Sequence, residues 1–144
     1  NGAKMINAVS NSTVPHLTVV IGSSYGAGTY GMSGRAFGNR FTFVWPTAKI
    51  AVMGPKQIAG VMSEVRRGQA TRAGIEFDEE ADTQLVAVVE AAQEKGSLAL
   101  TATGAVSDDG IIDPRDTRTV LGLTLSVVRN RAIEGAHGFG VFRL

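Results

Sequence analysis

The chain has 144 residues, of which 44% are hydrophobic and 19% charged, and this suits one domain with a substantial core. The absence of cysteine excludes disulfides, a thiol nucleophile and a cysteine metal site, and two histidines are too few for a typical zinc site. The net charge of +1 does not indicate nucleic-acid binding, and no apolar run reaches the roughly 18 residues that a membrane span requires.

The spacing of apolar and turn-forming residues predicts alternating helices and strands. In chain order, we expect a helix over residues 2–11, a strand buried on both faces over 17–21, a short helix over 27–32, strands over 41–45 and 49–53, and helices over 54–62, 78–95 and 117–132. Asp113 and Pro114 form a turn before the last of these helices. The order of the elements indicates an α/β fold.

Two of the predicted helices have informative surfaces. The helix over 78–95 places five apolar residues on one face: Ala81, Leu85, Val88, Val89 and Ala92. Four acidic residues at its start suit the helix dipole, so we interpret them as helix-start residues and not as a metal site. The helix over 117–132 is apolar nearly all round, which indicates burial on several sides or packing against a partner.

The most informative segment is a glycine loop, residues 22–32, which reads G-S-S-Y-G-A-G-T-Y-G-M and follows an apolar strand. Glycine lets the backbone approach a ligand closely, and the first N–H groups of a helix that begins there lack partners. Such a loop suits an anionic oxygen. Residues 1–63 carry five basic and no acidic side chains, and residues 64–144 carry nine basic and thirteen acidic ones. The loop thus lies in a positive half, which suits an anion unless the acidic half balances it.

The glycine loop matches a dinucleotide-binding motif, G-x-G-x-x-G, at Gly26, Gly28 and Gly31. That motif needs an acidic residue about 20 positions later to hold the ribose. The first acidic residue of the chain is Glu64, so this interpretation is weak.

The same loop also matches the nucleophile elbow G-x-S-x-G, at Gly22, Ser24 and Gly26. A serine hydrolase would complete its triad with an acid and then a histidine, and Asp113 and His137 follow in that order. However, His137 lies in a glycine-rich tail, and the chain is short for such a hydrolase. A third possibility is a structural turn that packs a helix closely onto a strand.

Three motifs in order give the chain a family resemblance. Residues 25–32 read Y-G-A-G-T-Y-G-M, residues 45–54 read W-P-T-A-K-I-A-V-M-G, and residues 108–118 read D-D-G-I-I-D-P-R-D-T-R. Together they resemble the carboxyltransferase (β) subunits of biotin-dependent acyl-CoA carboxylases, over almost the whole chain. The first motif looks most like the 3-methylcrotonyl-CoA branch. The resemblance implies a crotonase-like α/β fold, with residues 1–144 forming the C-terminal part of the second of two such domains and the N-terminal domain absent.

The resemblance also implies a chemistry for the glycine loop. In this family, CO2 passes from carboxybiotin to the enolate of an acyl-CoA, and backbone N–H groups stabilise the ureido oxygen as it becomes negative. The matching positions are Ala27 and Gly28, although the family's G-A order is reversed to A-G here. The deprotonated biotin is expected to take the substrate proton, which fits the absence of an obvious side-chain base.

Supporting biotin-binding roles fall on five further residues by the same resemblance: Tyr25, Gly26, Tyr30, Gly31 and Gly54. Gly26 and Gly31 would permit close backbone approach, and the two tyrosines either wall the pocket or are simply packed aromatics. Gly54 lies near the pocket or is an ordinary helix cap. Residues 108–116 are interpreted as loop-ordering hydrogen bonds and helix capping, and no metal is expected there.

Several partners follow from the resemblance. The chain has no Met-Lys-Met biotin-attachment motif, so biotin would arrive on a biotin carboxylase or biotin carrier partner. The acyl-CoA would bind mainly to the missing N-terminal domain, so residues 1–144 alone are expected to have little activity. The family forms homo-oligomers, usually hexamers, in the bacterial cytoplasm or the mitochondrial matrix. The alternatives are another crotonase-fold or serine hydrolase that uses Ser24, or an oligomerisation segment built on the last apolar helix.

Overall fold

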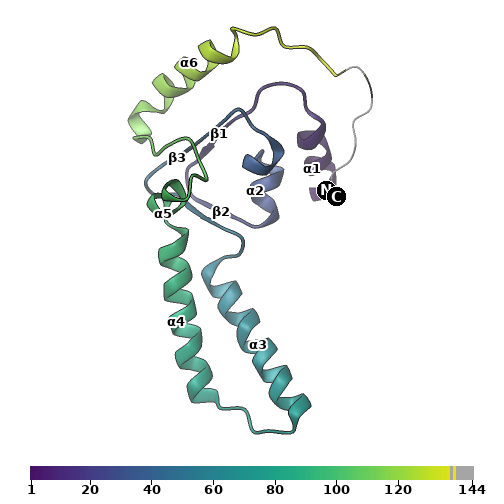
Figure 1. The fold of residues 1–144 in the computed structure, drawn as a ribbon, viewed down its shortest axis with the longest axis vertical. Coiled ribbons are helices and arrows are strands. Elements are labelled where there is room, and N and C mark those ends of the chain that lie inside the picture. The colour runs from purple at the N-terminus through teal and green to yellow at the C-terminus, as the bar shows by residue number, and fades with distance from the viewer. Residues whose placement is uncertain (137, 139–144) are drawn as a thin grey trace.

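The computed structural model describes residues 1–136 and residue 138. The strands form two parallel pairs whose members alternate along the chain (Figure 1). In the first pair, β1 (Leu17–Val20) lies beside β3 (Phe41–Val44), and in the second, β2 (Ser23–Tyr25) lies beside β4 (Lys49–Ala51). Parallel strands need a crossover connection, which is supplied here by α2 (Ala27–Gly31) and the 3-10 helix η1 (Arg35–Phe37).

The predicted strands are confirmed to within one or two residues at their ends, but two features differ. Strand β2 was not predicted, because three residues that are mostly serine carry no strand pattern. The prediction that residues 17–21 are buried on both faces is wrong for the described chain. All four residues of β1 are half-buried, and Ile21, just beyond the strand, is 58% exposed.

The packed core is small and lies beneath β3 and β4. Val44, Ala48 and Ala99 are almost completely buried, and Val20 and Ile50 pack against them. Ala99 opens α5 (Ala99–Gly104), an element that the sequence did not predict, and its N–H donates to the carbonyl of Ala48 at 3.1 Å. This contact attaches the helical half of the chain to the strands.

Helix α1 (Gly2–Asn11) is confirmed as predicted and packs against α2. The contact is close because Gly31 has no side chain: a Cβ at that position would lie 3.6 Å from Cε of Met5. The predicted short helix over residues 27–32 is confirmed as α2, with its end one residue earlier.

Helices α3 (Pro55–Ala73) and α4 (Glu79–Ser97) form a hairpin that extends away from the strands (Figure 1). Helix α3 ends eleven residues later than predicted. Its second half is polar and is held by α4 rather than by an apolar face. Arg66 donates to the buried Asp82 at 2.7 Å, and Arg67 makes two hydrogen bonds to Glu79.

The predicted apolar face of the 78–95 helix is partly wrong. Asp82 lies in the interface with α3, whereas Val88, which was placed on the apolar face, is 65% exposed. The four acids do lie at the helix start, and the Asp78 carboxylate caps it by accepting the Ala81 N–H at 2.9 Å.

The chain then continues through the 3-10 helix η2 (Pro114–Asp116) into α6 (Thr117–Val128). Helix α6 ends four residues earlier than predicted. Its apolar surface is largely open in the described structure, with Leu123 65% and Leu125 51% exposed. In the described part of the chain, no helix is both long enough and apolar enough to cross a membrane.

Candidate functional site

The glycine loop turns sharply between strand β2 and helix α2. Gly26 caps the helix with a φ of 60°, a conformation that side chains disfavour. Its N–H donates to the Ala51 carbonyl at 3.1 Å, which fastens the loop to β4. A Cβ at Gly26 would also lie 3.2 Å from the carbonyl oxygen of Val52. Both the conformation and the close contact therefore require glycine here.

Two successive backbone N–H groups stand open at the start of α2. Thr29 donates its N–H to the Gly26 carbonyl at 3.1 Å, but among the described residues the N–H groups of Ala27 and Gly28 have no acceptor. Both residues are exposed, and apart from its chain neighbours and its own helix backbone nothing lies within 4 Å of where a Cβ of Gly28 would be. This pair of donors fits an anionic oxygen that approaches from solvent.

The other predicted pocket residues fall into two groups. Tyr25 and Gly54 lie together beside the loop, since a Cβ at Gly54 would lie 3.3 Å from Cδ2 of Tyr25. Tyr30 is 44% exposed, and its ring lies 5.8 Å from that of Phe37. Gly31 faces α1, so its visible role is helix packing.

A pair of hydroxyl groups closes the glycine loop from the inside. Ser24 on β2 and Thr29 on α2 are joined by a hydrogen bond of 2.9 Å between Oγ and Oγ1. Both residues border a cavity of about 1130 Å³, together with Gly26 and Ala27. The partner of Ser24 is thus a hydroxyl group and not an imidazole. His137, which the hydrolase interpretation needs, lies outside the described residues.

The end of α2 is fixed by a second set of contacts. Ser33 is buried and adopts a φ of 59°, unusual for a residue with a side chain. A 2.6 Å hydrogen bond joins its Oγ to Nδ1 of His16, and its carbonyl accepts from the Thr18 hydroxyl at 2.8 Å. Nε2 of His16 is in turn hydrogen-bonded to Ser12, so β1 and the end of α1 both hold this turn.

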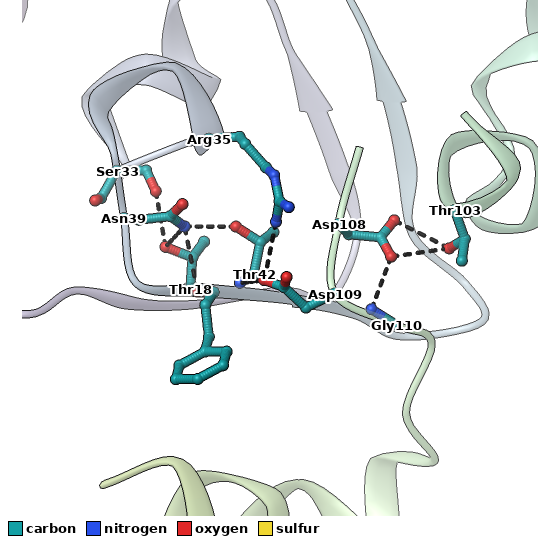
Figure 2. A network of polar contacts seen from close by, with 10 residues as sticks. Thr18, Ser33, Arg35, Asn39, Thr42, Thr103, Asp108, Asp109 and Gly110 are labelled. Carbon is teal, nitrogen blue, oxygen red and sulfur yellow. Dashed lines mark hydrogen bonds and ion pairs between the residues drawn. The ribbon is translucent and has the colours of Figure 1, made fainter. Parts of the chain in front are cut away.

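A polar network joins this turn to the third sequence motif (Figure 2). Asn39 donates to the hydroxyl groups of Thr18 and Thr42. The N–H of Thr42 and the guanidinium of Arg35 then converge on one carboxylate oxygen of Asp109, at 2.8 and 2.9 Å. Burial would raise the pKa of Asp109, but the Thr42 N–H and Arg35 outweigh it, and the pKa lies below its usual value.

The third motif forms an acidic loop, residues 108–113, which runs beside β3 almost as another strand. Asp108 is buried, and its carboxylate accepts from the Thr103 hydroxyl and from the Gly110 N–H. Asp113 accepts the Arg115 N–H at 2.8 Å and caps η2. These contacts confirm the interpretation of this segment as loop-ordering and capping.

The positive half of the chain is partly balanced by the acidic half. Arg35 pairs with Asp109, and Lys49 pairs with Glu94. The hydrogen bond to Glu94 raises the pKa of Lys49. In the part of the chain that the structure describes, no group of three or more histidine, aspartate or glutamate residues is placed to hold a metal ion.

Sequence reasoning missed the residues that hold the loop in place. Ser24 was considered only as a nucleophile, and Thr29 and Thr42 were not singled out. The partners of Ser24 and Asp109 are 5 and 74 residues away, and a hydroxyl group or an arginine carries no pattern that would identify such a pairing.

Comparison with known proteins supplies the family. The model of the carboxyl transferase domain matches residues 1–140. A probable biotin-dependent acyl-coenzyme A carboxylase beta2 subunit of Mycobacterium tuberculosis is 56% identical over the whole chain, which covers 27% of that protein. A probable mitochondrial methylcrotonoyl-CoA carboxylase beta chain of Drosophila melanogaster is 49% identical, also over the whole chain and over 25% of that protein.

Solved structures agree with this match. The beta subunit of geranyl-CoA carboxylase from P. aeruginosa superimposes with a TM-score of 0.79 at 40% identity, over 97% of this chain and 26% of that one. The transcarboxylase 12S structure, described as a hexamer, gives a TM-score of 0.74 at 31% identity, over 99% of this chain and 26% of that one. The crotonase-like α/β fold expected from the sequence is thereby confirmed. The chain spans about a quarter of the length of these relatives, and it belongs to the carboxyl transferase domain family.

Proposed function

We propose that this chain supplies the biotin side of a carboxyltransferase active site, and that the N–H groups of Ala27 and Gly28 form its oxyanion hole. The observation that carries the proposal is the pair of open donors at a glycine-fixed turn, in a chain that belongs to the carboxyl transferase domain family. Donors that are already aimed at a developing charge need no reorganisation during the reaction, and this is worth several kcal/mol of barrier, about 3 for one donor.

The residues present fit a ureido group. Gly26 provides the turn after which both amides are exposed and without an acceptor among the described residues, and a Cβ at Gly28 would stand in open space. Tyr25 is packed beside Gly54, and Tyr30 is 44% exposed and available to contact the ring system. When bound, carboxybiotin supplies the CO2 and, after losing it, the base. The chain's own contribution is to orient the ureido group and to stabilise negative charge on its oxygen.

The substrate we propose is 3-methylcrotonyl-CoA. Support comes from the YGAGTYGM form of the glycine loop and from relatives named as methylcrotonoyl-CoA carboxylases in Drosophila melanogaster and Arabidopsis thaliana. The geranyl-CoA carboxylase match widens the chemical class, because geranyl-CoA and 3-methylcrotonyl-CoA are both conjugated 3-methyl-branched enoyl thioesters.

The remainder of the machinery belongs to other parts of the assembly. We place these residues in the C-terminal part of the second carboxyltransferase domain, with the acyl-CoA held mainly by an N-terminal domain and biotin brought by a carboxylase or carrier partner. A homo-oligomeric core, as in the 12S hexamer, would complete the site between subunits. Mitochondrial names among the eukaryotic relatives support the matrix for a eukaryotic host and the cytoplasm for a bacterial one.

The test is a coupled carboxylation assay with the full-length subunit and its biotin-bearing partner. Four thioesters are compared: 3-methylcrotonyl-, geranyl-, propionyl- and acetyl-CoA. We expect the highest kcat/KM with 3-methylcrotonyl-CoA. A preference for propionyl- or acetyl-CoA would keep the reaction and overturn the substrate, whereas no carboxylation of any thioester would overturn the function. Residues 1–144 alone should show no turnover with free biotin and an acyl-CoA.

A further inference from the structure

We propose that Ser24 and Thr29 are a pair of positioning residues: their mutual hydrogen bond sets the direction in which the N–H groups of Ala27 and Gly28 point. This inference rests on the proposed function of the two amides. It gives Ser24, the serine of the G-x-S-x-G pattern, a role in which its hydroxyl never touches the substrate and forms no covalent bond to it.

Helix α2 is too short to hold its own conformation. The helix has only five residues, and a helix of one turn is not stable by itself, because its nucleation fixes several residues for a single hydrogen bond. Its first two N–H groups can keep a fixed direction only if something else anchors the turn. Gly26 anchors the side towards β4 through the Ala51 carbonyl.

Ser24 is held in place by the strand in which it lies. It lies in the middle of β2, paired with Ile50 of β4, and its side chain is half-buried. The hydrogen bond of 2.9 Å between Ser24 and Thr29 joins the two ends of the segment 24–29. Ala27 and Gly28 lie within this segment. Thr29 directly follows Gly28, and its own N–H donates to the Gly26 carbonyl at 3.1 Å, so fixing Thr29 fixes the far end of the short segment that carries both open N–H groups.

Thr29 is also held through its backbone carbonyl. Its carbonyl accepts the N–H of Gly34 at 2.8 Å. A Cβ at Gly34 would lie 2.6 Å from that oxygen, so the chain can come this close only because residue 34 is glycine. The side chain and the carbonyl of Thr29 are thus both held by hydrogen bonds. Of these two contacts, the hydrogen bond to Ser24 is the one that can be removed by deleting a single hydroxyl group.

The experiment uses the full-length subunit with its biotin-bearing partner and measures kcat, KM for the acyl-CoA and the melting temperature. Ser24→Ala and Thr29→Val each remove one hydroxyl group of the pair. Each should lower kcat by about tenfold with KM nearly unchanged, since the amides act in the transition state. The double variant should be no slower than either single variant by more than about twofold, because one shared bond is lost only once.

Two further variants serve as controls. Ser23→Ala removes the neighbouring exposed hydroxyl, which makes no side-chain hydrogen bond among the described residues, and should keep the wild-type kcat. Ser24→Thr keeps the hydroxyl group and should restore most of the rate. A purely structural role would instead lower the melting temperature and leave the kcat of the folded enzyme unchanged, and that result would overturn the proposal.

The remaining outcomes also decide the question. Additive losses in the double variant would mean that the two hydroxyl groups act separately, which overturns the pairing. Complete loss with Ser24→Ala, no rescue by Ser24→Thr and full activity of Thr29→Val would mean a nucleophilic serine. If the wild-type enzyme carboxylates no thioester, the proposed function fails. If it is active and Ser24→Ala is equally active, only the positioning pair fails.

Discussion

The glycine loop and the acidic loop lie in the same small body, yet their backbone amides are used in opposite ways. In the acidic loop, the Gly110 N–H donates to the Asp108 carboxylate, and the Asp109 N–H donates to the Thr42 carbonyl at 2.7 Å. In the glycine loop, two successive N–H groups have no acceptor among the described residues.

The difference indicates that the amides of the acidic loop stabilise the fold, whereas those of the glycine loop are available to bind a ligand. Unsatisfied donors contribute nothing to folding and favour a ligand, whereas satisfied ones order a loop. The glycine loop can leave its amides open because its neighbours hold it: the Ala51 carbonyl, the hydroxyl of Ser24 and the turn at Ser33. The acidic loop also supports the turn at Ser33, because Asp109 forms an ion pair with Arg35, two residues after Ser33.

The largest effect should come from Gly26→Ala, which changes the turn that positions the N–H groups of Ala27 and Gly28. Alanine disfavours the φ of 60° and would place its Cβ 3.2 Å from the Val52 carbonyl oxygen. The loop must shift to relieve both, and a shift near 1 Å at the reacting centre costs about a hundredfold in rate. We therefore expect kcat of the full-length enzyme to fall by about a hundredfold, measured in the coupled carboxylation assay.

The matched control for that change is Gly22→Ala in the same loop. No atom lies within 4 Å of a Cβ at Gly22, and its φ is not in the left-handed region. This variant should keep a kcat close to that of the wild type. Equal losses in Gly26→Ala and Gly22→Ala would mean that the loop tolerates no added methyl group anywhere, and that the positive φ of Gly26 is not the cause.

The next largest effect is on stability and belongs to the acidic loop. Asp108→Ala leaves the Thr103 hydroxyl and the Gly110 N–H without their acceptor, at a residue that is only 5% exposed. The loss should be about 2 kcal/mol, seen as a lower melting temperature of the full-length subunit. Asp108→Asn keeps one acceptor oxygen and should lose less. An unchanged melting temperature in Asp108→Ala would contradict the structural role of this loop.

Much of the fold could be predicted because its elements carry strong local patterns. The strands β3 and β4 and helices α1 and α2 lie within about two residues of expectation, since apolar runs and glycine or proline boundaries define them. The extent of α3 could not be predicted in this way. Its second half depends on Arg66 and Arg67 meeting acids of α4, which is tertiary information.

The candidate site shows the same division. The resemblance singled out the N–H groups of Ala27 and Gly28, and among the described residues both lack an acceptor, while their role stays a prediction. The hydrogen bond that joins the ends of this segment was not expected, since Ser24 and Thr29 are common residue types whose meaning arises only when the loop closes. The apolar surface of α6 remains a prediction of partner packing, with Leu123 open in the described structure.

A smaller effect should appear in the pH dependence of stability. The folded pKa of Asp109 lies below the ordinary value of 3.8, so its interactions with Thr42 and Arg35 stabilise the fold above that pH. This contribution is lost as the pH falls through the folded pKa. The melting temperature of the wild type should therefore exceed that of Asp109→Asn by a constant amount at neutral pH, and the difference should shrink below about pH 4. A difference that does not change with pH would exclude the carboxylate charge as its cause.

The smallest effect is expected at the turn after α2, where two contributions nearly cancel. Ser33→Gly removes the penalty of a side chain at a φ of 59°, about 1 kcal/mol, but also the hydrogen bond to His16, worth a similar amount. Ser33→Ala loses the same hydrogen bond and keeps the penalty. The glycine variant should thus melt close to the wild type, and the alanine variant should be less stable than both by about 1 kcal/mol. If the two variants have the same melting temperature, the turn stores no strain, and the hydrogen bond to His16 alone explains why a serine with positive φ is kept after α2.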